Sequence, residues 1–349
     1  MNRFLISFSL LCTCCTINQN IFNTKEIVFD NFEREIPISG TVVNLDTIVM
    51  APIGIYQVDS FLIFNHITGD YFFSLYNLQT KKFVGKFLQR GRGPNEFSNL
   101  SYWDEYTFQN NERWLYMSDN NLNCIFKFNL SGYFKTKTTQ IELLHQYNGR
   151  QMKNHAINDT TFLSFMITFF DKEVRVFYRK YFSTSDRLEE IELTRKNVNG
   201  YEEFDKLWSA EYIRPDKKKM AMAMIHCNRI HIFDLEEFRN NITLVPKNQL
   251  NISLSELVKQ DPLKTTIYYI STKATQDYIF ALFQNIRISD YQQRLNKMEI
   301  HVFDWNGYPV FKLVVNEYIN DFCVDWGTKI MYAFDYEENI YQYDLSHIL

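Results

Sequence analysis

Glycines, one proline and three basic residues crowd into the stretch GKFLQRGRGPNEF, which runs from Gly85 to Phe97. Glycine-rich loops bind phosphate when they lead from a strand into a helix, as in the pattern G-x-x-x-x-G-K-[ST]. Here no Lys-Ser or Lys-Thr follows Gly93, and the next segment, NEFSNLSYWDEY, shows no helical stripe. The pattern G-x-G-x-x-G also fails at Phe97. The stretch is therefore not predicted to be a phosphate-binding loop.

Other local signatures of chemistry are absent from the sequence. It contains no G-x-S-x-G, S-x-x-K, H-E-x-x-H or calcium-loop pattern. Beyond the N-terminus the cysteines are Cys124, Cys227 and Cys323, which are far apart and predicted to be buried thiols, although one disulfide stays open. No metal and no cofactor are expected. An active site assembled from several distant strands would leave no local motif, so an enzyme is not excluded.

The composition favours a folded protein rich in strands. Of 349 residues, 46% are hydrophobic and 17% are aromatic, led by 31 Phe and 22 Tyr. Aromatic rings suit the half-buried surface of a pleated sheet. The formal charge of −4 provides no general attraction to nucleic acid.

The N-terminal residues MNRFLISFSLLCTCC are typical of a secretory signal, with an early arginine and a short apolar run. That run is too short to cross a bilayer in a helix, which needs about 20 residues. The order Leu11, Cys12, Thr13, Cys14 resembles a bacterial lipobox, so residues 1–14 are predicted to be a lipoprotein signal with Cys14 acylated. Residues 15–25 would then form a tether. The sequence leaves open whether this tether faces the periplasm or the outer surface of the cell. The alternative is a cleaved signal with incidental cysteines.

Short alternating strands that end in Asn or Asp recur along the chain. The turn-opening residues are Asn77, Asn129, Asp234, Asp304 and Asp344. The gap from Asn129 to Asp234 is twice the gap from Asn77 to Asn129, so a further unit is expected near residue 182. A repeat of about 40–50 residues with four strands is typical of a β-propeller blade.

The sequence therefore predicts an all-β fold, a single six-bladed β-propeller over residues 26–349. Its blades are expected at residues 42–90, 97–143, 150–195, 205–247, 263–315 and 318–349. The last blade is one strand short, and the N-terminal strand within residues 26–37 is expected to pair with it and close the ring. An irregular β-sandwich or two smaller β-domains is the alternative.

The segment GRGPNEF and the C-terminal segment IHVFDWNGYPVFKLVVNEYINDFCVDWGTKIMYAFDYEENIYQYDL resemble the TolB-like six-bladed propeller lipoproteins of Bacteroidetes. This resemblance covers nearly the whole mature chain and implies the propeller fold and a place in the cell envelope. It implies no particular activity, because the family has no uniform one. Asn95 stands where these proteins often carry glycine.

In a propeller, the stretch around Gly91 forms a corner between the outer strand of one blade and the inner strand of the next. Gly91 and Gly93 would allow positive φ angles, and Glu96 would accept backbone N–H bonds or pair with a neighbouring arginine. Such corners lie where the channel opens, so contact with an anion is the alternative role. The candidate ligand-binding residues at this mouth are Arg90, Arg92, Glu96, His155, Tyr212, Arg214, Tyr268, Asn320 and Asp321.

Two functions remain open at this point. The first is a non-catalytic binding or scaffold module for a carbohydrate, a peptide or an envelope protein. The second is a hydrolase or lyase that acts on a polysaccharide or peptide at the channel mouth. Contact with a membrane is expected only through the N-terminal lipid.

The lipobox interpretation predicts that Cys14 receives the lipid, with Cys15 as the substitute. Cells that express the full chain are expected to incorporate labelled palmitate into it. The double variant Cys14→Ala, Cys15→Ala should lose the label and appear in the soluble fraction. Incorporation that survives the double change would refute the prediction.

Overall fold

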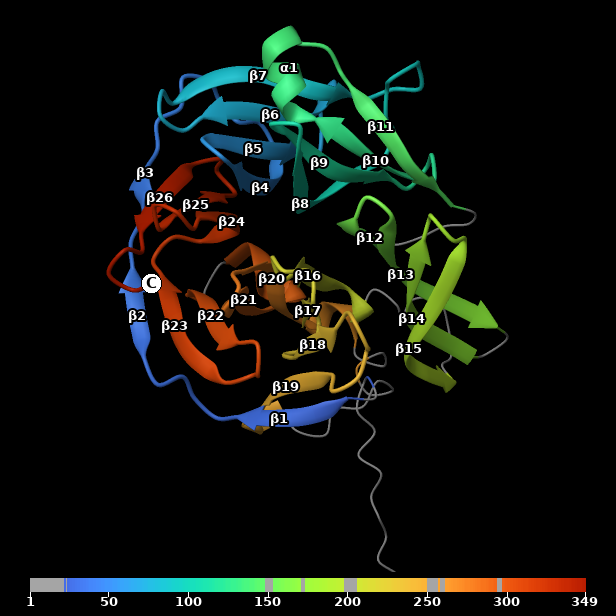
Figure 1. Cartoon of the computed structure of the whole chain (residues 1–349). Coiled ribbons are helices and arrows are strands. Elements are labelled where there is room, and N and C mark those ends of the chain that lie inside the picture. The colour runs from blue at the N-terminus through green and yellow to red at the C-terminus, as the bar shows by residue number, and fades with distance from the viewer. Residues whose placement is uncertain are drawn as a thin grey trace, which may run out of the picture.

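The computed structural model describes residues 22, 24–147, 153–170, 173–197, 206–249, 257, 261–293 and 297–349. Six antiparallel sheets stand around a common axis in chain order, as expected for a six-bladed propeller (Figure 1). The only α-helix among these residues is α1 (Leu130–Thr136), which Asn129 caps by accepting a hydrogen bond from the backbone N–H of Gly132. None of the described helices is long and apolar enough to span a bilayer.

Each blade is built from consecutive strands, of which the first is the innermost. Blade 1 contains β4 (Pro52–Val58), β5 (Phe61–His66), β6 (Tyr71–Asn77) and β7 (Lys82–Gln89). Blade 2 contains β8 (Leu100–Gln109), β9 (Glu112–Asp119), β10 (Cys124–Asn129) and β11 (Ile141–Gln146). Blade 3 contains β12 (Lys153–Asn158), β13 (Thr161–Phe170), β14 (Glu173–Phe182) and β15 (Arg187–Asn197).

The second half of the chain forms the other three blades. Blade 4 contains β16 (Ser209–Ile213), β17 (Lys219–Met224), β18 (Ile230–Asp234) and β19 (Ile242–Pro246). Blade 5 contains β20 (Thr266–Ala274), β21 (Tyr278–Arg287), β22 (Met298–Asp304) and β23 (Pro309–Val315). Blade 6 contains β24 (Ile319–Asp325), β25 (Ile330–Asp335) and β26 (Ile340–Asp344). Each blade lies within the range expected from the repeat or differs from it by a few residues.

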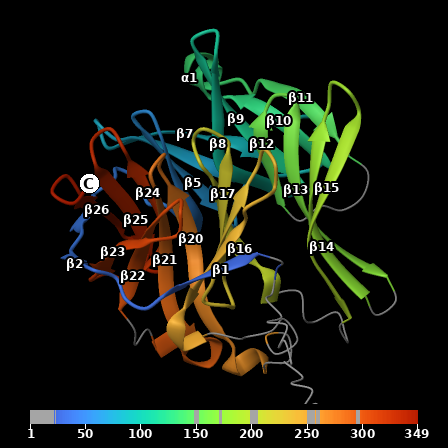
Figure 2. The same ribbon diagram turned by 60° about the horizontal axis from the view of Figure 1, so that its bottom comes forward.

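The N-terminal segment runs along the outer rim of three blades and closes the ring (Figures 1 and 2). Strand β3 (Thr41–Val42) pairs with β26 and gives blade 6 its fourth strand, so closure by the N-terminal segment is confirmed. The prediction that a strand within residues 26–37 closes the ring was wrong, however. Strand β1 (Lys25–Phe29) pairs in parallel with β19, and β2 (Glu35–Ile38) pairs in parallel with β23, so they widen blades 4 and 5.

Packing explains this placement of the first two strands. Phe29 joins the buried cluster between blades 4 and 5, and Ile38 joins the cluster between blades 5 and 6. Only the short segment that follows is needed to complete blade 6. The alternation of apolar residues over 25–38 therefore predicts a strand, but such a strand can pair with any outer blade edge that presents apolar side chains beside it.

The turn-opening residues do what the repeat predicted. The side chains of Asn77, Asp234, Asp304 and Asp344 each accept a backbone N–H from the turn that follows the strand. The unit expected near residue 182 is the hairpin of β14 and β15. In the insertion of blade 5, the short 3-10 helix η4 (Ile288–Gln293) follows β21. Other 3-10 turns are η2 (Lys247–Gln249) and η3 (Pro262–Lys264).

The described core consists of six apolar clusters, each of which lies between two neighbouring blades. The smallest, between blades 2 and 3, contains Tyr116, Ile125, Tyr147, Ala156 and Phe162. The three cysteines beyond the N-terminus are buried free thiols, as predicted. Because no cluster spans the whole molecule, the stability of the ring depends on every junction between blades.

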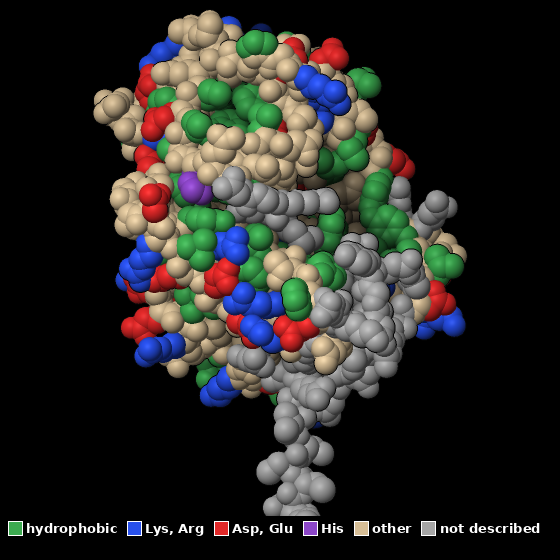
Figure 3. Space-filling model, turned by 90° about the vertical axis from the view of Figure 1, so that its right-hand side faces the viewer, with side chains coloured by type: hydrophobic (Ala, Val, Ile, Leu, Met, Phe, Trp, Pro, Cys, Tyr) green, Lys and Arg blue, Asp and Glu red, His purple; other side chains and the backbone are tan. Residues whose placement is uncertain are grey.

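The outer edge of blade 3 is left uncovered by the N-terminal segment. Its strands carry an ion-pair network in which Arg175 and Arg179 both bind Glu190, and Arg175 and Arg195 bind Glu192. Basic and acidic side chains are interspersed over this side of the molecule (Figure 3). Charged residues on an edge strand hinder pairing with other chains, so this network protects the exposed edge.

The stretch around Gly91 is a corner between β7 and β8, as predicted. Glu96 accepts the backbone N–H of Gly93 at 2.7 Å, and Gly91 donates to the carbonyl of Phe97 at 3.0 Å. The left-handed residue of the turn is Asn95, with φ of 62°, and Gly93 does not have the positive φ that was expected. Asparagine tolerates this conformation better than most residues, so the turn does not require glycine at this position.

Two glycines with nearly equal φ angles test how tightly blades 4 and 5 meet. Gly307 has φ of 92°, and a Cβ there would lie 2.5 Å from Leu244 of the neighbouring blade, whereas Gly69 has φ of 94° and open space around it. Gly69→Ala should cost only the backbone strain, about 1–3 kcal/mol. Gly307→Ala should lower the melting temperature further, because it also forces the blades apart. Equal melting temperatures in thermal melts of the two variants would contradict this account.

Candidate functional site

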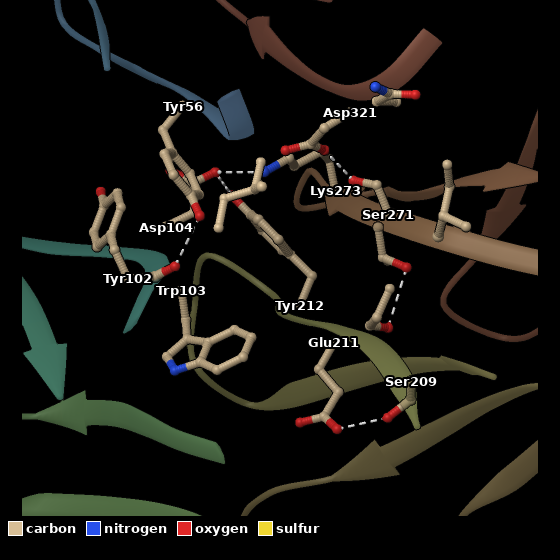
Figure 4. Close-up of a pocket in the computed structure, with 15 residues that line it drawn as sticks. Tyr56, Tyr102, Trp103, Asp104, Ser209, Glu211, Tyr212, Ser271, Lys273 and Asp321 are labelled. Atoms are coloured by element: carbon tan, nitrogen blue, oxygen red, sulfur yellow. Dashed lines mark hydrogen bonds and ion pairs between the residues drawn. The ribbon is translucent and has the colours of Figure 1, made fainter. Parts of the chain in front are cut away.

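A cavity of about 210 Å³ opens at the end of the channel where the innermost strands begin, here called the mouth face. Five of the six innermost strands line it, and β12 of blade 3 stands behind it (Figure 4). The lining residues are Ile53, Tyr56, Tyr102, Trp103, Asp104, Ser209, Ala210, Glu211, Tyr212, Ile270, Ser271, Thr272, Lys273, Asn320 and Asp321. Rings, carboxylates, hydroxyls and one ammonium group therefore share a small space.

Irregularities in the innermost strands position these side chains. The pairing of β8 with β9 is interrupted between Tyr102 and Tyr106, where Asp104 has a left-handed φ of 61°. This bulge lets Asp104 line the channel while the next residue, Glu105, reaches blade 3. Similar register shifts leave Ile53 in β4, Ile270 in β20 and Asn320 in β24 without a pairing partner on the adjacent strand. Bulges redirect side chains, which a regular strand would alternate between its two faces.

Lys273 forms the charged centre of the cavity. Its ammonium lies 3.5 Å from Asp104 Oδ2, 4.8 Å from the centre of the Tyr56 ring and 5.8 Å from that of Tyr212. Burial acts to lower the pKa of Lys273, but the carboxylates of Asp104 and Asp321 outweigh it and raise that pKa, so the ammonium stays charged. Among the described residues, Asp104 is its only ion-pair partner.

Asp104 is held less firmly than the other carboxylates of the cavity. The Tyr212 hydroxyl donates to Oδ2 at 3.2 Å, and Lys273 contacts the same oxygen, whereas Oδ1 has no contact with a described residue. Burial raises the pKa of Asp104, and nearby Asp321 adds to the rise, although Lys273 opposes it. The ammonium of Lys273 therefore forms an ion pair with Asp104 and also stabilises the charge of Asp321 from a greater distance.

Side chains at the channel satisfy the free backbone edges of the innermost strands. At five of the six junctions, a side chain of one blade bonds a backbone group of its neighbour's innermost strand. Ile55 N–H donates to Asp321 (3.0 Å), Tyr56 hydroxyl to Tyr102 C=O (3.0 Å), Ala156 N–H to Glu105 (2.6 Å), Lys153 to Ser209 C=O, and Thr272 hydroxyl to Ala210 C=O (3.2 Å). At the sixth junction the Ser271 hydroxyl donates to Asp321 Oδ1 at 2.5 Å.

Behind the cavity lies a chain of buried charges. His155 is 1% exposed, with Nδ1 at 2.7 Å from Glu105 and Nε2 at 2.9 Å from Glu211. Lys153 and Ser209 bind the other oxygen of Glu211. Burial acts to lower the pKa of His155, but the two carboxylates raise it to about 9. Burial acts to raise the pKa of Glu211, but Lys153 and His155 outweigh it and lower that pKa to about 2.

Each of these groups is already bound by its neighbours in the chain of charges. Both nitrogens of His155 donate to carboxylates, and both oxygens of Glu211 accept from cations or a hydroxyl. Within the described ranges, no three His, Cys, Asp or Glu side chains converge in a way that would hold a metal ion. The buried chain therefore acts as support for the wall of the cavity.

The cavity includes three of the residues that the sequence suggested, namely Tyr212, Asn320 and Asp321. His155 lies directly behind Glu211, and its role is to hold the wall. The other five lie outside the lining. Arg90 stacks on Phe72, Arg92 is exposed, Glu96 binds the corner, Arg214 pairs with Asp216, and Tyr268 stacks on Phe283.

Sequence reasoning missed Lys273, Asp104, Tyr56 and Trp103, which define the character of the cavity. Trp103 and Asp104 lie within the bulge of β8, and Tyr56 and Lys273 lie two residues beyond the register shifts of β4 and β20. Polar residues among apolar ones in YWDEY and ISTKA are the only trace of this in the sequence. Such a pattern does not show which strand faces the channel.

Comparison with known proteins places this architecture in a family. Residues 31–326 match the model of the TolB-like 6-blade propeller-like family. The chain belongs to this family. No curated protein sequence matches it.

The solved structures that resemble this TolB-like chain have low sequence identity to it. One is an exported protein, so described provisionally, from Bacteroides fragilis: it is 13% identical, has a TM-score of 0.56, and the match covers 92% of this chain and 98% of that one. Another is Raptor from Chaetomium thermophilum, which is 11% identical with a TM-score of 0.46 over 94% of this chain and 29% of that one. At these identities the likeness concerns the fold alone.

The buried chain of charges predicts how stability depends on pH. Because the pKa of His155 rises from 6.5 to about 9 on folding, its stabilising effect is complete below pH 6.5 and is lost as the pH rises through 9. At about 1.4 kcal/mol for each pKa unit, the loss is at most about 3.5 kcal/mol. The measurement is the free energy of unfolding by denaturant between these pH values.

The variant His155→Gln should lose this pH dependence, because no ionisable group replaces the imidazole. His347→Gln is the matched control, since His347 is exposed at the C-terminus and should leave the pH dependence as it is. A His155→Gln protein with the parent's slope would show that the histidine is neutral in the folded state.

Proposed function

We propose that this protein is an exported, lipid-anchored binding module, which takes a polar ligand at the mouth face and does not transform it. The observation that carries the proposal is the cavity around Lys273, where the ammonium has one partner at 3.5 Å and Asp104 Oδ1 has none among the described residues. A charged group that is buried and only partly coordinated is suited to bind a polar group that enters from solvent.

The coordination of the other ionisable groups favours binding over hydrolysis. Hydrolysis of a glycosidic bond commonly requires two carboxyl groups that act as acid and as base or nucleophile. Asp321 accepts bonds on both oxygens, from Ile55 and Ser271 among others, and Glu211 is likewise saturated. Asp104 alone has a free oxygen, and a single carboxylate beside an ammonium group is a recognition pair.

Export and anchoring are supported by two independent features. The first is the signal-like N-terminus with Cys14, which lies outside the described residues. The second is the name of the Bacteroides fragilis relative, which proposes that that protein is exported. A lipid on an N-terminal cysteine would hold the propeller at a membrane through the segment that precedes β1.

The proposal predicts that the purified mature protein binds a member of a glycan or peptide array and does not turn it over. Asn320→Ala should weaken that binding by about two- to tenfold, the effect of one lost hydrogen bond. Asn320 makes no hydrogen bond with another described residue, so the variant should keep its melting temperature.

Asn99→Ala is the matched control, because Asn99 is exposed and lies outside the cavity. Arg92→Ala tests whether the site extends to the corner loop. Turnover of a bound ligand in a parallel activity screen would replace the proposal by the hydrolase or lyase. Equal affinities of the parent, Asn320→Ala and Asn99→Ala proteins would place binding elsewhere.

A further inference from the structure

We infer that the cavity recognises a neutral hydroxylated group, namely a single sugar unit at the end of a glycan. This inference rests on the proposed function and specifies the ligand of the same site. It follows from three properties of the described residues: the balance of charge in the cavity, the capping of the backbone edges, and the hydrogen-bonding capacity that Lys273 and Asp104 have left.

The charge balance excludes an anionic ligand. Among the described residues that line the cavity, Lys273 is the only cation, and it already faces the carboxylates of Asp104 and Asp321. The cations behind the wall, Lys153 and protonated His155, are bound to Glu211. A phosphate, a uronic acid or a C-terminal carboxylate would therefore add a negative charge to a space with no positive charge to spare.

A cationic ligand is excluded by Lys273 itself. Its ammonium occupies the position that such a ligand would need, 4.8 Å from the centre of the Tyr56 ring and within 3.5 Å of Asp104 (Figure 4). A second ammonium or guanidinium group in a cavity of about 210 Å³ would lie close to the first. Repulsion at such distances is strong in a partly buried site.

Capping of the backbone edges argues against a peptide. Peptides commonly bind to sheets by pairing with a free strand edge. Here one or two backbone groups on each of β4, β8, β12 and β16 are already bonded by a side chain of a neighbouring blade, as at Ile55, Tyr102 and Ala210. The cavity therefore offers side-chain groups and rings but no continuous edge to which a peptide could add.

A hydroxyl group fits the hydrogen-bond donors and the acceptor that remain unused in the cavity. The ammonium of Lys273 has donors to spare, and Asp104 Oδ1 is a free acceptor beside it. A hydroxyl accepts from the first and donates to the second, which a carbonyl or an ammonium cannot do alone. Tyr56 and Tyr212 provide rings on which the C–H face of a sugar can rest. The volume is below the roughly 300–1,000 Å³ of larger ligand pockets, so one sugar unit fits.

The test is a glycan array that includes neutral, acidic and deacetylated amino-sugar termini, run beside a peptide array with the same protein. Binding to neutral termini is expected, with competition by the free methyl glycoside of the terminal sugar. The affinity should change less than about twofold between low and high salt, because no net charge is neutralised. Deoxygenation of the recognised hydroxyl should weaken binding about tenfold or more, since the buried pair then loses its partner.

Asp104→Asn tests the charge balance directly. It should weaken binding of the neutral glycan about tenfold and should improve binding of acidic termini, because the charge of Lys273 is no longer balanced. Asp277→Asn is the matched control, as Asp277 is exposed and outside the cavity. If Asp104→Asn fails to fold, Tyr212→Phe, which removes the hydroxyl that holds Asp104, should weaken neutral glycans alone.

The outcomes separate the two proposals. Peptides or acidic glycans that bind with dependence on Asn320 and Asp104 would overturn the sugar assignment and leave a binding site at the mouth. An absence of any binding that these variants weaken would overturn the proposed function and the sugar assignment together.

Discussion

The innermost strand of each blade has one edge with no strand to pair with, and the structure depends on how the backbone groups of that edge are satisfied. A buried N–H or C=O without a partner costs about 1–3 kcal/mol. In this protein the partners are side chains of the neighbouring blade, such as Asp321 for Ile55 and Glu105 for Ala156. The bonds that cap the edges of β4, β8, β12 and β16 therefore also join neighbouring blades, which adds to the apolar clusters between them.

This constraint explains why so many charged residues lie at the channel. Glu211, Lys153 and His155 bind one another and the backbone of β16, and the strongly shifted pKa values of Glu211 and His155 follow from that mutual binding. Shifted pKa values are often taken to mark active sites. Here the shifts have a structural cause, because both nitrogens of His155 and both oxygens of Glu211 are engaged with neighbouring residues behind the cavity wall.

The sequence predicted the blades well and the site poorly, and the two results have one cause. Blade boundaries are set by local turn chemistry, which is visible as Asn77 or Asp304 after an alternating strand. The partner of the N-terminal strands could not be predicted, because an apolar alternation fits several outer edges. The cavity depends on bulges at Ile53, Asp104, Ile270 and Asn320, where a single displaced residue decides which side chains face the channel. A bulge has no clear mark in one sequence when a non-glycine residue such as Asp104 adopts the left-handed conformation.

The same reasoning bears on how a TolB-like propeller can retain its fold while its ligand changes. Capping of the innermost strands needs a donor or an acceptor at each junction, but a Thr hydroxyl, a carboxylate and a Tyr hydroxyl all serve that purpose in this one chain. The residues are thus replaceable as long as the bond is made, which is consistent with a shared fold at 13% identity. Specificity is then left to the few groups that capping does not occupy. In this protein they are the ammonium of Lys273, one oxygen of Asp104 and the amide of Asn320, so a change at these positions would leave the bonds between the blades in place.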